Sequence, residues 1–358
     1  AVASEALSGT VYFEMGTQKW GQATNNGTAQ GAALGADGQI VKVKNAYIDW
    51  AIPQTDAKIR MGIQGLALPN TVAGGSAVMD TDVAAVVASY KFNENVGLTA
   101  LWARPLNDNY VDNNKPTQNN YLDNMDLFAV TLPVKLDGFG ITPWAMYGMM
   151  GKNSLTNYNV NNNWTTTDGN PPFTLRPYPF ASNGNVVPGG TSKAYGSMFW
   201  AGLPVTLTMF DPLNVELDIN YGYVESMGRY SVQKGRGGDI VRGSTQRQGW
   251  LAKALVEYKM DWATPGLFGW YASGDDSSVK NGSERMPSIA GAGNFTSFIG
   301  DGNLSWSPVA NGCDWTMSYA GTWGIGAQLK DMSFMEDITH TFRLAYWGGT
   351  NAPSMVKY

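Results

Sequence analysis

The chain contains little charge, a single cysteine and no long apolar run. Charged residues make up 15% of its 358 positions, against about 25% in an average soluble domain. No stretch approaches the ~20 consecutive apolar residues that a membrane-spanning helix needs. The sequence therefore excludes a helical membrane protein. Strands that alternate polar and apolar residues stay compatible with the mean hydropathy of −0.22, because alternation cancels in an average.

The scarcity of cysteine and histidine restricts the chemistry further. Cys313 has no second cysteine with which to form an internal disulfide. Together with His340, the only histidine, it cannot build the usual zinc cluster or a catalytic Cys/His pair. The net charge of −5 argues against a nucleic-acid partner. Composition thus predicts a protein that is not an enzyme and has no resident cofactor.

Alternation with a period of two residues recurs along the whole chain. In 214–223, apolar or aromatic residues occupy the odd positions, and polar residues or glycine occupy the even ones. Because successive side chains of a strand point to opposite faces, this pattern predicts a strand with one apolar face and one polar face. Roughly thirteen such strands are predicted. They cover about 8–16, 40–52, 57–68, 83–92, 96–104, 125–135, 139–150, 194–209, 213–224, 248–260, 266–273, 315–329 and 338–347.

The connections between these strands alternate between short and long. The short ones lie at 53–56, 93–95, 138, 210–212, 261–265 and 330–337, and the long ones at about 17–39, 69–82, 105–124, 151–193, 225–247 and 274–314. Aromatic residues also gather near strand ends. An up-and-down barrel in an outer membrane has tight periplasmic turns, long outward loops and aromatic girdles. The sequence therefore predicts an all-β protein, an antiparallel up-and-down transmembrane β-barrel.

Several stretches resemble a known family. The segments Asn45–Trp50, Met61–Pro69 and Ser89–Leu98, with 273–276 and 333–346, are similar to the homotrimeric outer-membrane porins of sulfate-reducing bacteria, of the Desulfovibrio type. The resemblance implies a homotrimer in the bacterial outer membrane, in contact with lipid and lipopolysaccharide. It also implies a water-filled channel through which small hydrophilic solutes and ions diffuse passively.

A more distant resemblance reaches the enterobacterial general porins. In those proteins a Leu-Pro, a Gly-Gly and acidic residues precede a strand, as Leu68-Pro69, Gly74-Gly75, Asp80 and Asp82 do here. The segment 69–82 then corresponds to the loop that narrows the pore. The position of this loop implies two strands before Ala1 and a closing strand after Tyr358. Residues 1–358 would then be a single barrel domain, incomplete at both ends, with about sixteen strands in the complete chain.

Charged residues on the polar faces are the candidates for the pore lining. Lys58 and Arg60 face the lumen if Ile59 and its apolar neighbours face lipid, since a basic side chain costs ~2–4 kcal/mol at the lipid midplane. By resemblance, this basic wall faces Asp80 and Asp82 across a narrow eyelet, where opposed charges filter solutes. The alternative is that these charged side chains face water in the lumen and lie away from any constriction. The predicted lining comprises Lys58, Arg60, Gln64, Asp80, Asp82, Glu216, Asp218, Lys253, Glu257 and Arg343, with Lys42 and Lys44 on a strand whose facing is ambiguous.

Other assignments stay open for the loops. The segment 151–193 is longer than 69–82 and carries aromatic residues that are able to plug a pore. The basic residues of 225–247 suit lipopolysaccharide phosphates or simple solvation. Residues 107–114 are rich in Ca²⁺-type oxygen ligands but lack the glycine and terminal glutamate of an EF-hand loop. The Gly-, Ala- and Met-rich stretches 141–150 and 196–202 are predicted contacts between trimer subunits, because small side chains permit close approach.

Two other classes of protein compete with the pore. A soluble β-rich binding protein such as a propeller would show internal repeats of roughly 40–50 residues, and the sequence shows none. An outer-membrane lipase would use His340 with a nearby serine. However, His340 shares its parity with Phe342 and Leu344, which directs it toward lipid or a protein interface.

Overall fold

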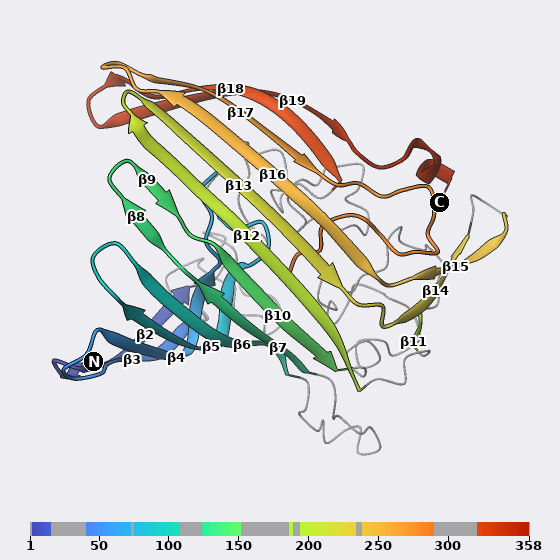
Figure 1. Cartoon of the computed structure of the whole chain (residues 1–358), viewed down its shortest axis with the longest axis horizontal. Coiled ribbons are helices and arrows are strands. Elements are labelled where there is room, and N and C mark those ends of the chain that lie inside the picture. Colours follow the sequence, from blue (N-terminus) through green and yellow to red (C-terminus); the bar gives the residue numbers. More distant parts are fainter. Residues whose placement is uncertain are drawn as a thin grey trace, which may run out of the picture.

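One curved antiparallel sheet forms most of the protein (Figure 1). The computed structural model describes residues 2–15, 41–72, 75–107, 124–151, 186–188, 194–233, 238–289 and 321–357. Within these ranges the sheet has 16 strands, of which β8 and β9 form a side hairpin, while the others follow one another in chain order. The topology is therefore that of an up-and-down β-barrel. Among the described residues, the strands at the two ends of this order are not paired with each other.

The strands of the main path are long, and each pairs antiparallel with the next. Among the described residues, no helix is long and apolar enough to cross a membrane. The main strands are β1 (Val2–Ser4), β2 (Leu7–Met15), β3 (Val41–Ala51), β4 (Ala57–Ala67), β5 (Asp80–Lys91), β6 (Gly97–Asn107), β7 (Asn124–Thr131), β10 (Trp144–Gly151), β12 (Tyr195–Phe210), β13 (Leu213–Val224), β16 (Arg247–Tyr258), β17 (Thr264–Ala272), β18 (Thr322–Met335) and β19 (Ile338–Gly349). The remaining elements are β8 (Val134–Leu136), β9 (Phe139–Ile141), β11 (Val186–Pro188), β14 (Gly228–Gln233), β15 (Ile240–Ser244) and the 3₁₀ helix η2 (Pro353–Lys357).

All thirteen predicted stretches contain a strand, but several boundaries differ. The stretches 125–135 and 139–150 are each interrupted, at Pro133 and at Pro143, because proline cannot donate a ladder hydrogen bond. The strand predicted at 315–329 runs instead from Thr322 to Met335, and the turn predicted at 330–337 shrinks accordingly. Residues 315–320 lie outside the described ranges.

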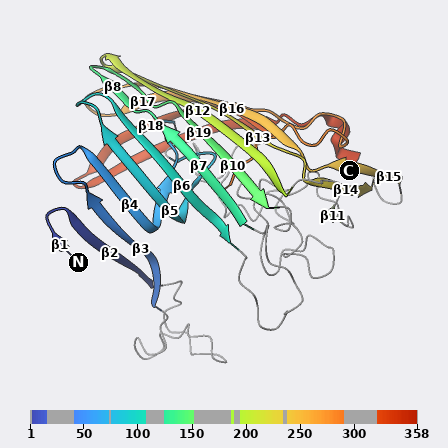
Figure 2. The ribbon, with the colours of Figure 1, turned by 60° about the horizontal axis from the view of Figure 1, so that its bottom comes forward.

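A second, small sheet was not predicted. Strands β11, β14 and β15 form a 3-stranded sheet from parts of the segments that were predicted as the long loops 151–193 and 225–247. Figure 2 shows this sheet beyond one end of the main strands, where β13 ends. The sequence gives no strong alternation there, so the pattern that revealed the main strands could not reveal these.

The two faces of the main sheet differ in burial, and β13 shows the rule. Asp218 and Asn220 are buried, whereas Ile219 and Tyr221 are 51% and 41% exposed. Glu216 lies on the side of Asp218, and Val215 and Leu217 on the side of Ile219, as the period-two pattern predicts. We call the face that carries Asp218 the inner face and the opposite one the outer face.

Large rings on the inner face lie against glycines of the neighbouring strand. The register pairs Trp144 with Gly202 and Trp270 with Gly324. A Cβ atom at either glycine would overlap the indole that lies over it. Cross-strand aromatic–glycine pairs of this kind help to fix strand register.

The glycines of the two predicted subunit-contact stretches have the same role. At Gly148 a Cβ would meet Met198 at 2.7 Å and Leu127 at 2.9 Å, and both of those side chains are buried. Gly148 and Gly202 therefore make room for side chains of the inner face, and not for an approaching subunit on the outer face. These glycines therefore give no support to a subunit contact at these stretches, which stays a prediction.

Candidate functional site

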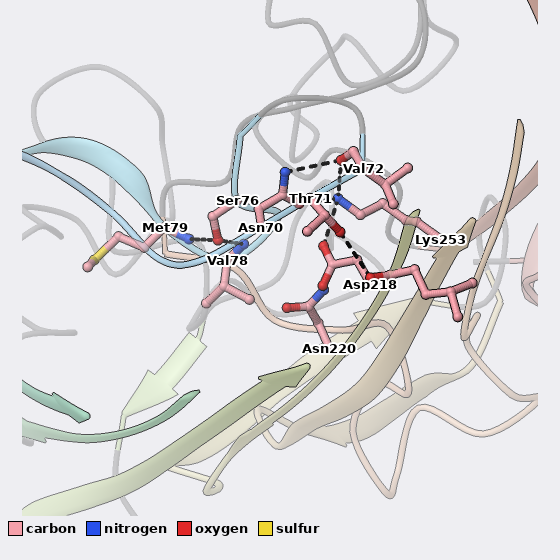
Figure 3. Close-up of polar contacts among 10 residues, drawn as sticks. Asn70, Thr71, Val72, Ser76, Val78, Met79, Asp218, Asn220 and Lys253 are labelled. Carbon is pink, nitrogen blue, oxygen red and sulfur yellow. Dashed lines mark hydrogen bonds and ion pairs between the residues drawn. The ribbon is translucent and has the colours of Figure 1, made fainter. Parts of the chain in front are cut away.

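The connection between β4 and β5 crosses the inner face of the sheet and reaches strands β13 and β16. We call residues 68–79 the inward loop. The Thr71 hydroxyl donates a hydrogen bond to the Leu217 carbonyl of β13 at 2.9 Å, and Val72, Val78 and Met79 are fully buried. Figure 3 shows Thr71 and Val72 beside Asp218 and Lys253, with Val78 and Met79 near Ser76 in another part of the loop. The inward loop is thus packed against β13 and β16, which follow it in the chain by about 140 residues or more.

Local bonds shape the inward loop. Its base is closed by a hydrogen bond from the Leu68 amide to the Met79 carbonyl at 3.0 Å. The Ser76 hydroxyl accepts hydrogen bonds from the amides of Val78 and Met79, which is a turn that serine commonly forms. Gly75 has a φ of 116°, a conformation that residues with a Cβ rarely adopt.

Lys253 of β16 binds the inward loop to the inner face of the sheet. Its ammonium group donates hydrogen bonds to Asn70 Oδ1 at 2.6 Å and to the Val72 carbonyl at 2.9 Å. The same nitrogen lies 3.1 Å from Asp218 Oδ2, and the two side chains are 0% and 1% exposed. Two hydrogen bonds and one ion pair therefore fix the ammonium group between the inward loop and Asp218.

The backbone register sets up this contact. Asp218 of β13 and Lys253 of β16 are direct cross-strand partners, so their side chains leave the same face at the same level. Asn220 donates a hydrogen bond to Asp218 Oδ1 at 3.0 Å, which further fixes the carboxylate. A buried ion pair needs such additional hydrogen bonds to offset the cost of removing its charges from water.

A second segment supports the inward loop from the connection after β17. The Val78 carbonyl accepts hydrogen bonds from the Ile289 amide at 2.9 Å and from the Ser288 hydroxyl at 3.2 Å. The neighbouring Pro287 carbonyl accepts a hydrogen bond from the Trp200 indole at 3.0 Å. The inward loop therefore lies between the strand wall and residues 287–289.

A row of polar side chains continues along the inner face toward the short turns. Glu257 is its centre, because it accepts hydrogen bonds from Asn214 at 3.1 Å and from Gln328 at 2.7 Å and lies 2.6 Å from Lys330 Nζ. Arg343 extends the row by donating to Gln328 Oε1 at 3.1 Å. Charged and amide groups from four strands thus form one connected polar surface.

A separate charged group lies on β3 and β4. Arg60 forms a two-pronged ion pair with Asp49, with N···O distances of 2.8 and 2.9 Å, and lies 4.2 Å from the centre of the Tyr47 ring. Lys58 Nζ is 3.4 Å from Asp49 Oδ1 and keeps about half of its side chain exposed. One carboxylate therefore faces two cations, which leaves a net positive charge at this part of the inner face.

Most of the predicted lining residues share the inner face. Gln64, Asp218, Lys253 and Glu257 are buried there. The full set of predicted residues on this face is Lys58, Arg60, Gln64, Glu216, Asp218, Lys253, Glu257 and Arg343.

Asp80 and Asp82 do not lie with Lys58 and Arg60. The register pairs Asp82 with Gly65, next to the pair of Gln64 with Val83, so the alternation places Asp82 on the outer face and Val83 on the inner one. Asp82 Oδ1 accepts a hydrogen bond from Asn45 at 2.8 Å. The predicted eyelet of these two acids against Lys58 and Arg60 is therefore not formed; Asp49 is the acid that meets both cations.

The ambiguous facing of Lys42 and Lys44 is explained by a bulge. The register between β2 and β3 shifts by one residue at Lys44, which reverses the alternation on either side of it. Lys42 then pairs with Glu14, and Lys44 Nζ lies 3.9 Å from Glu14 Oε2.

Several predictions concern residues outside the described ranges. Ala73 and Gly74 of the inward loop, residues 108–114 and most of 151–193 are among them. His340 lies within the described ranges. Its ring is 5.2 Å from that of Phe334 at the short-turn end of β18 and β19. Asp49, Asn70, Gln328 and Lys330 were not predicted as site residues. Asp49 alternates with Ile48 and Trp50 in the sequence, but Lys42 and Lys44 left the facing of that strand ambiguous.

Comparison with solved structures finds distant likenesses. No family model matches the chain, and no curated protein matches it. Among solved structures, Salmonella typhi OmpF in complex with daunomycin has a TM-score of 0.39 at 10% identity, over 97% of this chain and 87% of that one. The CymD monoaromatic hydrocarbon channel has 0.26 at 11%, over 95% and 82%. A Pseudomonas aeruginosa FadL homologue has 0.27 at 12%, over 96% and 79%.

Proposed function

We propose that the protein is a porin: a bacterial outer-membrane barrel through which small hydrophilic solutes and ions diffuse passively. The observation that carries the proposal is the division of the sheet into a polar inner face and an apolar outer face, with the inward loop bound across the inner side by Lys253. A curved wall of this kind separates a wet interior from a lipid exterior. The inward loop then narrows the bore.

The outer face supports a lipid environment. Large apolar side chains such as Ile219, Leu267 and Leu344 are 51%, 66% and 79% exposed, whereas monomeric soluble proteins rarely expose large contiguous apolar patches. Stacked aromatic pairs occur toward the long-loop end, as in Trp250 and Tyr271 at 5.1 Å. Aromatic residues at the two ends of the strands are typical of the interfacial girdles of membrane barrels. A soluble binding protein would need a partner to cover this whole face.

We infer the partners of the protein from the outer face. Outer-membrane lipid and lipopolysaccharide would contact the outer face. A homotrimer would cover part of it with neighbouring copies, and the outer-face carboxylate of Asp82 suits a protein interface better than lipid, because charges facing lipid are costly.

Electrical recording tests the pore directly. The full chain, purified in detergent, should insert into planar bilayers and give stepwise conductance in potassium chloride. Proteoliposomes should swell with small sugars and stop swelling above a size limit, because the inward loop narrows the bore. Insertion without conductance, or equal swelling with small and large sugars, would contradict a constricted pore.

Ion selectivity should depend on Lys58 and not on Asp82. Replacing Lys58 with glutamine removes an inner-face cation beside Asp49, so we expect the cation-to-anion permeability ratio to rise by roughly two- to fivefold, since one charge a few ångströms away acts with up to about 1 kcal/mol in water. The matched control is Asp82→Asn, which changes an outer-face charge and should leave the ratio unaltered. Reversal potentials in a salt gradient measure both. A shift with Asp82→Asn and none with Lys58→Gln would show that the facing is reversed.

A further inference from the structure

Three carboxylates meet in the segment that follows β17. Asp275, Asp276 and Glu284 each bring an oxygen to within 4.8 Å of the others; we call them the rim cluster. That spacing is about the widest that one ion with metal–oxygen distances of about 2.4 Å can bridge, and this distance is typical of Ca²⁺. Acidic residues on a loop often gather without a ligand, so the spacing alone does not establish a site.

Asp275 supplies a second, independent observation. It is only 1% exposed, and neither of its carboxylate oxygens accepts a hydrogen bond from the described residues. A buried carboxylate without donors is costly unless a charge or a proton compensates it. Burial and the neighbouring Glu284 raise the pKa of Asp275 to about 8, against the opposing effect of the Arg285 charge.

The other two carboxylates are held in place by donors. Asn281 Nδ2 bridges Asp276 Oδ2 at 2.9 Å and Glu284 Oε1 at 3.0 Å, and the Asp276 amide donates to Glu284 Oε2 at 3.0 Å. Each carboxylate can accept about four interactions, so these bonds leave capacity for a cation. Asp276 is exposed, which gives an ion access from solvent.

We propose that the rim cluster binds a calcium ion. Ca²⁺ takes oxygen ligands in flexible geometry, whereas Mg²⁺ demands near-ideal octahedral coordination at shorter distances. In this arrangement the ion compensates Asp275, and Asp276 and Glu284 complete the carboxylate ligands. Water would fill the remaining positions.

The location gives the ion a structural role. The Asp275 amide donates to Asn351 Oδ1 at 2.8 Å, and the Asp275 carbonyl accepts from the Ala352 amide at 2.7 Å, which ties the cluster to the chain just before η2. The same segment continues to Ser288 and Ile289, which bond to Val78 of the inward loop. Calcium at the rim would therefore stabilise a segment that supports the inward loop.

Calorimetry on the whole protein tests the site. The full chain in detergent is stripped with EDTA and titrated with calcium chloride. We expect one site with a dissociation constant on the order of 10⁻⁴–10⁻³ M, as in extracellular calcium modules, and weaker binding of magnesium chloride. Asp275→Asn and Asp276→Asn should each weaken calcium binding at least tenfold. The control Asp261→Asn, at an exposed turn between β16 and β17, should bind as the wild type does.

A second measurement separates calcium from a proton as the compensating charge. Saturating calcium should raise the thermal midpoint of the wild type and of Asp261→Asn, but not that of Asp276→Asn, a substitution at an exposed position that should leave the fold intact. A wild type whose midpoint and titration heat ignore calcium, or an Asp276→Asn protein that binds normally, would overturn the proposal. Binding is measured without any conductance, so failure of the pore and failure of the site are distinguishable.

Discussion

Replacing Lys253 with methionine is expected to lower the free energy of unfolding by about 3–5 kcal/mol, the usual cost of removing one partner of a buried ion pair. Asp218 would lose its countercharge, and the inward loop would lose its bonds through Asn70 and Val72. Because methionine keeps an unbranched apolar stem of similar reach but has no donor, the loss reports mainly on the ammonium group. We also expect a larger and noisier single-channel conductance, since the released loop would no longer narrow the bore. Denaturant unfolding and bilayer recording measure the two effects.

Two further variants make this prediction specific. Lys259→Met removes an exposed lysine just beyond the end of the same strand and should change neither stability nor conductance appreciably. Asp218→Asn combined with Lys253→Met removes both charges, so it should be more stable than Lys253→Met alone while keeping the raised conductance. If Lys253→Met left conductance and its noise at wild-type values, the loop would not depend on Lys253 or would not narrow the path.

Introducing arginine at Ile219 is expected to destabilise the folded protein in membranes by ~2–4 kcal/mol, because this outer-face position lies toward the middle of β13, where lipid is most apolar. Leu213→Arg, on the outer face at the start of the same strand, should cost only ~0–1 kcal/mol, since basic residues near the interface reach the head groups. Unfolding in lipid vesicles by guanidinium measures both.

The difference between the two arginine variants is the informative quantity. Both residues have the same facing, so a soluble protein with a solvated outer face would tolerate both alike. Equal and small costs would therefore show that the outer face does not contact lipid, and would remove the main support for the porin proposal.

The fold could be predicted because the alternation is long-range and redundant. β13 shows this most clearly: every residue from Val215 to Tyr221 takes the face that its parity assigns. A pattern repeated on so many strands tolerates local irregularities. The exceptions have local causes, such as the bulge at Lys44 and the prolines 133 and 143, which interrupt pairing without disturbing the overall pattern.

The site could be predicted only in part. Small residues and the family resemblance indicated that 69–82 turns inward, but the face of Asp80 and Asp82 depends on where β5 begins. A single residue of register decides that choice. The hydrogen bonds from Lys253 to the inward loop could not be predicted, because they join residues up to 183 positions apart. No local sequence pattern shows which loop reaches which strand.

The pairing of inner-face rings with glycines has a consequence for the proposed bore. Trp144 and Trp270 pack against Gly202 and Gly324, where any added Cβ would overlap the ring. A methyl group at either glycine would tilt the indole away from the wall and into the interior. The free cross-section inside the barrel therefore depends on residues that never touch a passing solute, and a single Gly→Ala change could narrow the path without altering one lining side chain.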